Sequence, residues 1–333
     1  MKRKAGFVLV VLVALLAVSC VVAVSRGSVN IPWRTSLLIL LGERGGDWPA
    51  SYERILLGVR IPRVLMAAVV GGSLSVAGVS FQALLQNPMA DPYIIGVSAG
   101  AALGATVGII RLGPTSFKLV PVLAFLGALG AMATVYMLAK RGPRVPVVPL
   151  LLSGVAVSAF LSAVVSLLMV THRERLDRVV FWLMGGLTGA SWERLLSILP
   201  YAVAGFCIMY YFSRDLNALL FGEDQAAHLG VEVERVKAIL LFTASLVTAA
   251  AVSVTGLIGF VGLIVPHLMR LLTSPDHRIL LPASALGGAS LLVLSDMLSR
   301  TLLSPAEIPV GILTAMMGGP FFLYLLYRRK GGM

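Results

Sequence analysis

One string in the sequence has the residue types and spacing of a catalytic serine. Gly96-Val-Ser-Ala-Gly100 matches the G-x-S-x-G pattern, which exposes a serine nucleophile on a tight turn between a strand and a helix. That chemistry also needs a histidine and a carboxylate close to Ser98. Here Pro92-Tyr-Ile-Ile leads directly into a glycine-rich apolar stretch, with no strand before the serine. An intramembrane serine hydrolase using Ser98 is therefore kept only as an alternative.

Motifs for nucleotide and metal chemistry are absent from the sequence. No G-x-x-x-x-G-K-[ST] string occurs and no lysine follows a glycine, so the chain is not expected to bind ATP through a P-loop. No H-E-x-x-H zinc motif occurs either. The two cysteines, Cys20 and Cys207, each lie inside an apolar run, which favours neither a disulfide framework nor a thiolate metal site. We expect no cofactor and no metal on this chain.

The composition of the chain indicates which class of protein it belongs to. Of 333 residues, 58% are hydrophobic and only 13% are charged, whereas soluble proteins carry about 25% charged residues. The net charge is +12, but the charges fall between long apolar stretches and do not form one basic face. These observations predict an all-α polytopic membrane protein in a lipid bilayer and argue against a nucleic-acid partner.

Charge-free stretches locate the membrane helices, because a charge at the centre of a spanning helix costs roughly 2.5 to 3.5 kcal/mol on insertion scales. The run between Lys237 and Arg270 is too long for one helix and contains several glycines and Pro266, so we divide it into a full helix and a short one. The sequence then predicts a single transmembrane domain over residues 1–333. Its ten helices are expected at residues 5–24, 61–83, 93–110, 119–138, 147–170, 195–212, 238–255, 259–272, 280–299 and 309–327.

The first of these stretches has an alternative interpretation. Its basic start and Ala17-Val-Ser-Cys20 resemble a secretory signal peptide with a lipoprotein cleavage site. The apolar core of a signal peptide is typically about 7 to 15 residues long, whereas a run of about 20 can span a bilayer. We therefore predict a transmembrane helix at residues 5–24.

The predicted topology leaves two long polar segments outside the membrane. An even number of helices puts both termini on one side, and the basic clusters Lys2 to Lys4 and Arg328 to Lys330 place that side in the cytoplasm. Residues 25–60 are then the longest external segment and residues 214–236 the longest cytoplasmic one. The cytoplasmic segment has short helical stretches interrupted by glycines, which suggests a surface for docking a partner.

Few charged residues lie in or next to the predicted helices, and they help to decide which class of transporter the chain could be. Asp296 is the only acidic residue inside a predicted helix, and Arg300, four residues later, is its expected ion-pair partner. Ion-coupled secondary transporters usually have buried acids or histidines that bind the ion, so this class is kept only as an alternative. Arg60, Arg63 and Arg300 either anchor the chain to lipid headgroups or form a basic collar for an acidic partner.

The third predicted helix has a glycine at every fourth position. Gly96, Gly100, Gly104 and Gly108 lie on one helical face, where small residues let two helices approach closely in lipid. We interpret this ridge as a site of helix packing within the chain. A pore-lining or dimer surface is the alternative.

Several long motifs, in order along the chain, resemble the permeases that import iron chelates, haem and cobalamin. In the first half these are Arg60-Ile-Pro-Arg-Val-Leu, Gly71-Gly-Ser-Leu-Ser-Val-Ala-Gly78 and Asn87-Pro-Met-Ala-Asp-Pro92. In the second half they are Leu216-Asn-Ala-Leu-Leu-Phe-Gly-Glu-Asp-Gln, Gly259-Phe-Val-Gly-Leu-Ile-Val-Pro-His-Leu-Met-Arg270 and Glu307-Ile-Pro-Val-Gly311. The resemblance covers residues 5–327.

This resemblance implies the fold and partners of a type II ABC importer permease. Such a permease has ten helices per subunit and pairs with a second copy, here expected as a homodimer. Two ATPase subunits, which bind ATP and Mg, lie below it, and a substrate-binding protein docks above. The expected location is the cytoplasmic membrane of a bacterium or archaeon. A ferric siderophore is the first choice of cargo, with haem and cobalamin close behind.

The resemblance also assigns roles to particular positions. Arg60, Arg63 and Arg300 match the family's docking positions for the binding protein. The cytoplasmic gate matches Asn87, Met89, Val147 and Val148, although the stretch Val145 to Pro149 departs from the more polar residues often found there. The ATPase-coupling positions are Leu216, Leu219, Leu220, Phe221, Gly222, Glu223, Leu229 and Gly230.

Overall fold

The fold is helical throughout the part of the chain that the structure describes. A computed structural model describes residues 2–27, 29, 31–43, 45–112 and 119–330, so the two ends of the predicted 1–333 domain, Met1 and residues 331–333, lie outside it. Apart from helices, these ranges contain one isolated antiparallel bridge, between Arg141 and Arg144. Helices satisfy their backbone hydrogen bonds internally, as a bilayer requires. The all-α prediction is confirmed.

Each of the ten predicted stretches contains a helix. Seven spans within the described ranges are long and apolar enough to cross a membrane, whereas α5, α13 and α15 contribute shorter apolar helices. That all ten cross the bilayer stays a prediction. The helices are α1 (Lys2–Ser25), α4 (Ile61–Leu84), α5 (Val97–Leu112), α6 (Leu119–Ala139), α7 (Val147–Thr171), α9 (Trp192–Tyr211), α12 (Val233–Thr255), α13 (Val261–Leu272), α14 (His277–Thr301) and α15 (Val310–Lys330).

Capping side chains explain why two helices begin earlier than the charge pattern suggests. Ser191 Oγ accepts a hydrogen bond from the Arg194 amide at 3.3 Å, at the start of α9. Asp276 Oδ1 accepts one from the Arg278 amide at 3.0 Å, at the start of α14. Such oxygens satisfy amides that have no partner within the first turn of a helix.

The connections contain short helices that charge-free stretches do not reveal. They are α2 (Trp33–Leu40), α3 (Ala50–Ile55), α8 (Leu176–Leu183), α10 (Ser213–Leu219) and α11 (Glu223–His228). A π-helical turn, Leu56–Arg60, joins α3 to α4 into one continuous helix. This differs from the expected helix start at residue 61, next to Pro62. Pro62 has no N–H group and cannot donate the backbone hydrogen bond of a regular α-helix, and the helix widens into a π-helical turn just before it.

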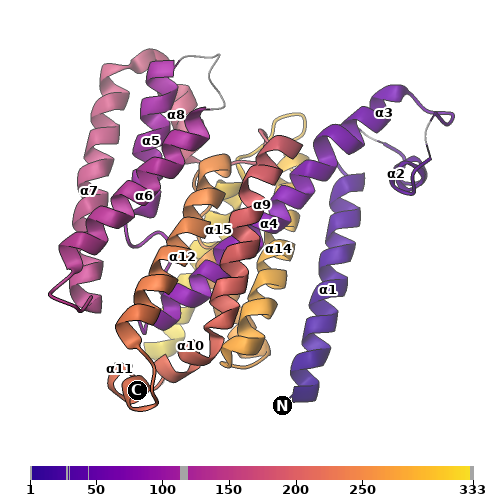
Figure 1. The fold of residues 1–333 in the computed structure, drawn as a ribbon. Coiled ribbons are helices and arrows are strands. Elements are labelled where there is room, and N and C mark those ends of the chain that lie inside the picture. The colour runs from indigo at the N-terminus through magenta and orange to yellow at the C-terminus, as the bar shows by residue number, and fades with distance from the viewer. Residues whose placement is uncertain (1, 28, 30, 44, 113–118, 331–333) are drawn as a thin grey trace.

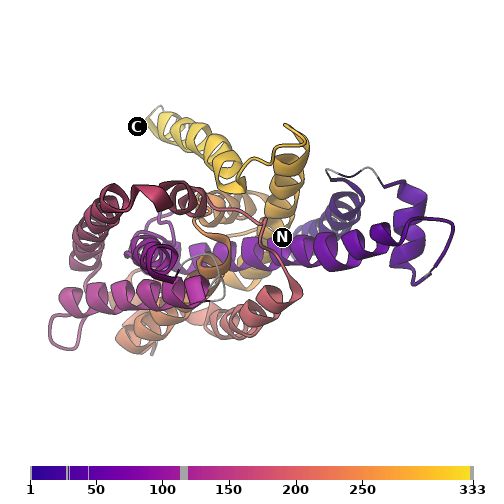
Figure 2. The ribbon, with the colours of Figure 1, turned by 90° about the horizontal axis from the view of Figure 1, so that it is seen from above.

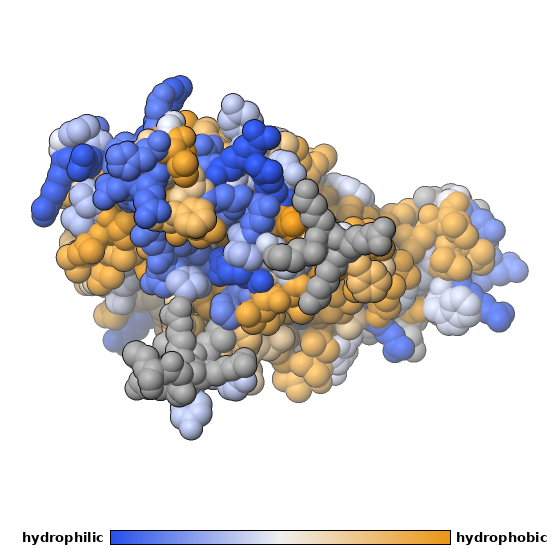
Figure 3. All heavy atoms as spheres, turned by 90° about the horizontal axis from the view of Figure 1, so that it is seen from below, coloured by the Kyte–Doolittle hydropathy of each residue, from blue (hydrophilic) through white to orange (hydrophobic). Residues whose placement is uncertain are grey.

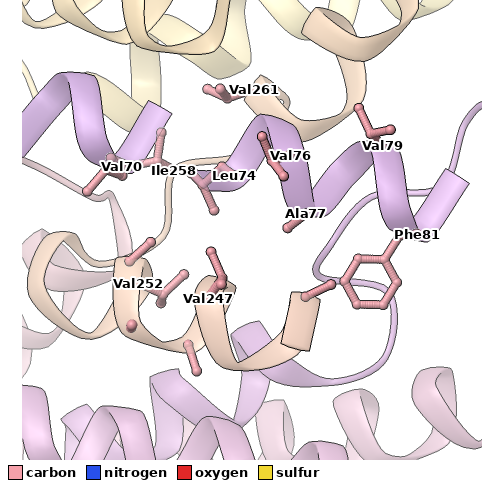
Figure 4. Packing of buried hydrophobic residues seen from close by; sticks show 14 of the residues in the cluster. Val70, Leu74, Val76, Ala77, Val79, Phe81, Val247, Val252, Ile258 and Val261 are labelled. Carbon is pink, nitrogen blue, oxygen red and sulfur yellow. The ribbon is translucent and has the colours of Figure 1, made fainter. Parts of the chain in front are cut away.

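Helix α4 is the centre of the bundle and is buried along most of its length. It packs against α9, α12, α13 and α14, and Figure 4 shows Leu74 and Ala77 on the side that faces Val247 and Val252 of α12. A Cβ atom added at Gly78 would overlap the Gly262 carbonyl oxygen of α13, and one at Gly71 would overlap that of Gly288 in α14. Glycine therefore lets three backbones meet.

The predicted glycine ridge lies mostly between α5 and α6. A Cβ atom at Gly100 would overlap the Gly127 carbonyl oxygen, and one at Gly104 would overlap that of Leu123. A Cβ atom at Gly108 would lie 3.2–3.4 Å from atoms of Val120 and Leu123 of α6. Gly96 differs, because it precedes α5 and adopts a left-handed conformation, with φ of +86°. The ridge thus makes close contacts inside this chain.

Two flanks surround the central helix. Helices α1 to α3 project to one side and α5 to α8 form the other (Figures 1 and 2). Helix α1 begins and α15 ends at the end of the bundle where α10 and α11 lie (Figure 1). We call this the inner end and the opposite one the outer end, following the predicted topology.

Candidate functional site

A cluster of charged side chains occupies the outer end, where α4 meets α14. Arg63 of α4 contacts Asp296 of α14 (Nη2 to Oδ1, 2.9 Å) and Glu307 (Nη1 to Oε2, 2.9 Å). Arg300 Nε lies 3.1 Å from the second oxygen of Asp296, so the pair predicted from the i, i+4 spacing is present. One buried carboxylate therefore holds two guanidinium groups. We call Arg60, Arg63, Asp296, Arg300 and Glu307 the outer charge cluster.

The other contacts of this cluster fasten α1 to the bundle. Arg60 donates to the carbonyl oxygens of Val24 and Ser25, each at 3.0 Å, and to that of Val29. Arg300 donates to the carbonyl oxygens of Ala23 at 3.2 Å and Arg26 at 3.3 Å. Carbonyls in the last turn of a helix lack partners inside the helix and carry partial negative charge. The two arginines satisfy them.

The three predicted docking arginines lie together, but they are directed inward. Arg60, Arg63 and Arg300 are only 4%, 6% and 4% exposed. Their binding-protein role stays a prediction, because in this structure their guanidinium groups are engaged within the chain. The part that sequence reasoning missed is Glu307, whose proximity to Arg63 across 244 positions no local spacing reveals.

A cavity of about 460 Å³ lies beside Arg63 and Glu307 at the outer end. Its wall includes Phe181 and Trp182 of α8, Arg194 of α9 and the end of α12 at Ser253 to Thr255. Arg178, also in α8, adds a further cation. A space with aromatic and basic walls suits a bulky ligand that carries acidic groups. Sequence reasoning did not select these residues.

The predicted coupling residues at the inner end divide into buried anchors and an exposed surface. Leu216 and Leu219 of α10 are 0% and 2% exposed, whereas Leu220, Phe221 and Leu229 are 49%, 68% and 70% exposed. Gly222 and Gly230, with φ of +105° and +87°, make the turns on either side of α11. Viewed from below, hydrophilic side chains gather on this face beside apolar surface (Figure 3). The exposed side chains are a candidate protein-binding surface.

Helix α10 is anchored to α14 by hydrogen bonds. Asn217 Nδ2 donates to Asp276 Oδ1 at 2.8 Å, and Asn217 Oδ1 accepts from the His277 amide at 2.8 Å. Gln86, just after α4, donates to the Leu219 carbonyl oxygen at 3.5 Å. Displacement of α10 would therefore act directly on the inner ends of α14 and α4.

Helix α11 is anchored through Lys237, a buried residue of α12. The Lys237 ammonium lies 2.8 Å from Glu223 of α11 and 3.5 Å from Glu234, and it donates to the Val145 carbonyl oxygen at 2.9 Å. Glu234 in turn accepts a hydrogen bond from the Val145 amide at 2.9 Å. Val145 lies two residues before α7. Of the predicted residues, only Glu223 belongs to this network.

The predicted gate residues lie in two segments at the inner end. Asn87 is exposed and accepts a hydrogen bond from the Met89 amide at 3.0 Å, which shapes the turn after α4. Val147, half-buried, and Val148, 66% exposed, begin α7. The 85–96 connection meets α7 where Gly154 packs against Ile94. Within this connection, burial raises the pKa of Asp91 to about 6.

The environment of Ser98 does not support a nucleophile elbow. Ser98 lies in the first turn of α5, and turns, not a strand, precede it. Among the described residues, no group of three His, Cys, Asp or Glu side chains is placed to hold a metal ion.

Comparisons with known proteins identify the family. The sequence profile of the FecCD transport family matches residues 15–328. The cobalamin import system permease protein BtuC of Halobacterium salinarum is 45% identical over 308 residues, covering 92% of this chain and 83% of that protein. The hemin transport system permease protein HmuU of Yersinia pestis is 40% identical over 338 residues, covering 98% and 95%.

A solved structure agrees with these sequence matches. It is described as an inward-facing conformation of a metal-chelate type ABC transporter, and it has a TM-score of 0.86 and 33% identity over 97% of this chain and 99% of that one. The chain therefore belongs to the FecCD transport family and is a multi-pass transport permease subunit, not an enzyme.

Proposed function

We propose that this chain is the permease of a binding-protein-dependent ABC importer that carries a metal chelate across the cytoplasmic membrane. The observation that carries the proposal is the inner surface of Leu220, Phe221 and Leu229, exposed in the turns on either side of α11, between short helices that are fastened to the bundle. Such a surface fits a partner that drives movement from outside the membrane. It also accords with the absence of a P-loop in this sequence.

The proposed assembly contains a second copy of this chain, two ATPase subunits and a substrate-binding protein. ATP and Mg bind to the ATPase subunits, and this chain binds no cofactor. The ATPase subunits contact α10 and α11, with both termini of the permease on the same cytoplasmic side. Arg60, Arg63 and Arg300 mark the outer end at which the binding protein docks, and carboxylates on that protein would have to replace their partners within this chain in order to pair with them.

The two anchors suggest how ATPase closure reaches the gate. Movement of α10 would pass through Asn217 to α14, and movement of α11 would pass through Glu223 and Lys237 to the connection before α7. Val147 and Val148 begin α7, so their position relative to Asn87 and Met89 would change as the inner end opens or closes. Substrate would enter from the outer end of the dimer.

Reconstitution tests the proposal against its alternatives. The full chain is placed in proteoliposomes with its ATPase and binding protein, and uptake of a radiolabelled chelate is measured. We expect uptake to require ATP hydrolysis and to persist when an ionophore removes ion gradients. Uptake that needs an ion gradient but no ATPase would instead support a secondary transporter. We expect Ser98→Ala to keep wild-type uptake. Loss of activity in this variant would instead support a serine hydrolase.

The cargo is identified through the binding protein, which supplies much of the selectivity. We propose a ferric siderophore first, with haem and cobalamin as the other candidates; relatives of this chain are named for cobalamin, hemin and ferric citrate. Thermal unfolding of the cognate binding protein is compared with each chelate added at the same concentration. The chelate that raises the melting temperature most is the expected cargo.

A further inference from the structure

A large groove at the inner end lies beside the exposed coupling surface but does not include it. Its volume is about 1140 Å³, and its walls come from the end of α9, the start of α10, the start of α12 and Arg278 of α14. Leu220, Phe221 and Leu229 do not line it. Gly230, the last of the coupling positions, does line the groove, so the groove is a second site that adjoins the proposed ATPase contact.

One wall of the groove has the composition of a membrane interface. It is built from Phe206, Tyr210, Tyr211 and Phe212 at the end of α9. The rings of Phe206 and Tyr210 stack with centroids 5.9 Å apart, and Tyr211 is 77% exposed. Aromatic residues at the ends of transmembrane helices lie at the level of lipid headgroups. The groove thus opens where headgroups and the first part of the acyl chains meet.

The rest of the groove is basic, and three helices supply its cations. Arg214 of α10, Arg235 of α12 and Arg278 of α14 line it, together with Asp215 and Glu232. Arg235 pairs with Glu232 at 3.2 Å. In the described part of the chain, neither Arg214 nor Arg278 forms a salt bridge, and both are exposed. Asp215 lies in the groove with these two guanidinium groups, and Asp276, outside it, is near enough to Arg278 for that cation to help lower the Asp276 pKa.

We propose that this groove binds the phosphate of an anionic phospholipid, with phosphatidylglycerol as the test ligand. Guanidinium groups bind phosphate oxygens in a bidentate manner, and basic pockets between transmembrane helices on the cytoplasmic side bind anionic headgroups. The aromatic wall receives the glycerol backbone and upper acyl chains. Because Arg214 belongs to the first turn of α10, the bound lipid steadies the helix that carries the coupling surface.

Native mass spectrometry of the purified full chain tests the site. Palmitoyl-oleoyl phosphatidylglycerol and the matching phosphatidylcholine are titrated against the wild type and the double variant Arg214→Gln/Arg278→Gln. We expect the wild type to prefer phosphatidylglycerol and the double variant to bind this lipid about thirtyfold more weakly. Each cation near the membrane surface contributes about 1 kcal/mol, and each 1.4 kcal/mol changes the affinity about tenfold. Phosphatidylcholine binding should change little.

Controls separate this site from general surface charge and from misfolding. Arg141→Gln/Arg144→Gln removes two exposed cations from another turn of the inner end and should retain lipid preference. Arg214→Lys/Arg278→Lys keeps the charge and should retain most of the binding. Equal weakening in the Arg141→Gln/Arg144→Gln control, or unchanged binding in the glutamine variant of the groove, would overturn the proposal.

Two further measurements distinguish the lipid from other occupants. Inorganic phosphate at millimolar concentration should not displace phosphatidylglycerol, and displacement would identify a free anion site instead. Phosphatidylglycerol binding should also persist when the ATPase subunits are added to the permease. Loss of the lipid on assembly would show that the groove is a protein interface and would overturn the lipid assignment. None of these outcomes depends on which chelate is transported.

Discussion

The two ends of the bundle use their charged and apolar residues in opposite ways. At the outer end, Arg60, Arg63 and Arg300 are buried and satisfied by carboxylates and carbonyl oxygens of the same chain. At the inner end, Phe221 and Leu229 are exposed in the turns on either side of α11, and a few polar contacts hold α10 and α11. The outer charge cluster is thus satisfied within the chain, whereas the inner end presents apolar side chains that a partner would cover.

The comparison predicts that the largest loss of stability comes from the outer end. Arg63→Met leaves Asp296, which is 1% exposed, with one cation and removes the partner of Glu307. Removing one partner of a buried ion pair destabilises a protein by about 3–5 kcal/mol. Thermal unfolding of the purified permease in detergent measures the effect as a fall in melting temperature. An unchanged melting temperature would show that the cluster does not hold α1, α4 and α14 together.

A matched control uses an exposed arginine of the inner end. Arg235 pairs with Glu232, and both side chains are largely exposed, at 73% and 69%. Exposed ion pairs contribute about 0–1 kcal/mol, so Arg235→Met should leave the melting temperature nearly unchanged. A similar fall in both variants would mean that lost positive charge, and not burial, explains the effect at Arg63.

Local patterns in the sequence predict the helices but not the contacts between them. Charge-free runs located ten helical stretches, because a charge is costly inside a bilayer. The Asp296 to Arg300 pair follows from helical spacing. The contact between Arg63 and Asp296 joins residues 233 positions apart, and only the packing of α4 on α14 brings them together. That is why the same arginines suggested an exposed collar before the fold was known.

The inner end illustrates the same limit. Leu216 to Gly230 could be selected by resemblance, yet the side chains that anchor this segment could not. Lys237 falls between the predicted cytoplasmic segment 214–236 and the predicted helix 238–255, and its contact with Val145 spans 92 positions. Asn217 reaches Asp276 and His277 across 59 and 60 positions. Such contacts depend on how helix ends meet, which no single stretch of sequence encodes.

A smaller loss of stability is expected from the buried cation of the inner end. Lys237 is 3% exposed, but its partners Glu223 and Glu234 have side chains 35% and 32% exposed. Water can solvate these carboxylates when the ammonium is removed. We therefore expect Lys237→Met to cost about 1.5–3 kcal/mol, the range for hydrogen bonds to charged groups.

Transport measurements distinguish a connecting role of Lys237 from a merely structural one. If Lys237 passes movement of α11 to α7, Lys237→Met should lower the amount of chelate taken up per ATP hydrolysed, and Lys237→Arg should restore much of it. Proteoliposomes containing the assembled importer supply both quantities. Uptake and hydrolysis that fall in equal proportion would limit Lys237 to holding the fold.

The smallest effect on stability, and the clearest test of the comparison, is expected at Phe221. Its side chain is 68% exposed, so Phe221→Ser should change the free energy of unfolding by no more than about 0.5 kcal/mol. If α10 and α11 contact the ATPase, however, loss of this aromatic anchor should weaken ATPase binding by about 2 kcal/mol, or about thirtyfold. Biolayer interferometry with the permease in nanodiscs measures that affinity.

Phe181 provides the matched control, because it is 65% exposed and lies at the opposite end, on α8. Phe181→Ser removes the same kind of side chain from a similar exposure, so it should leave ATPase affinity unchanged. Weaker ATPase binding in Phe221→Ser alone would assign the uncovered inner surface to that partner. Equal affinities in both variants would place the ATPase contact elsewhere, and the contrast between the two ends would then describe the permease only before assembly.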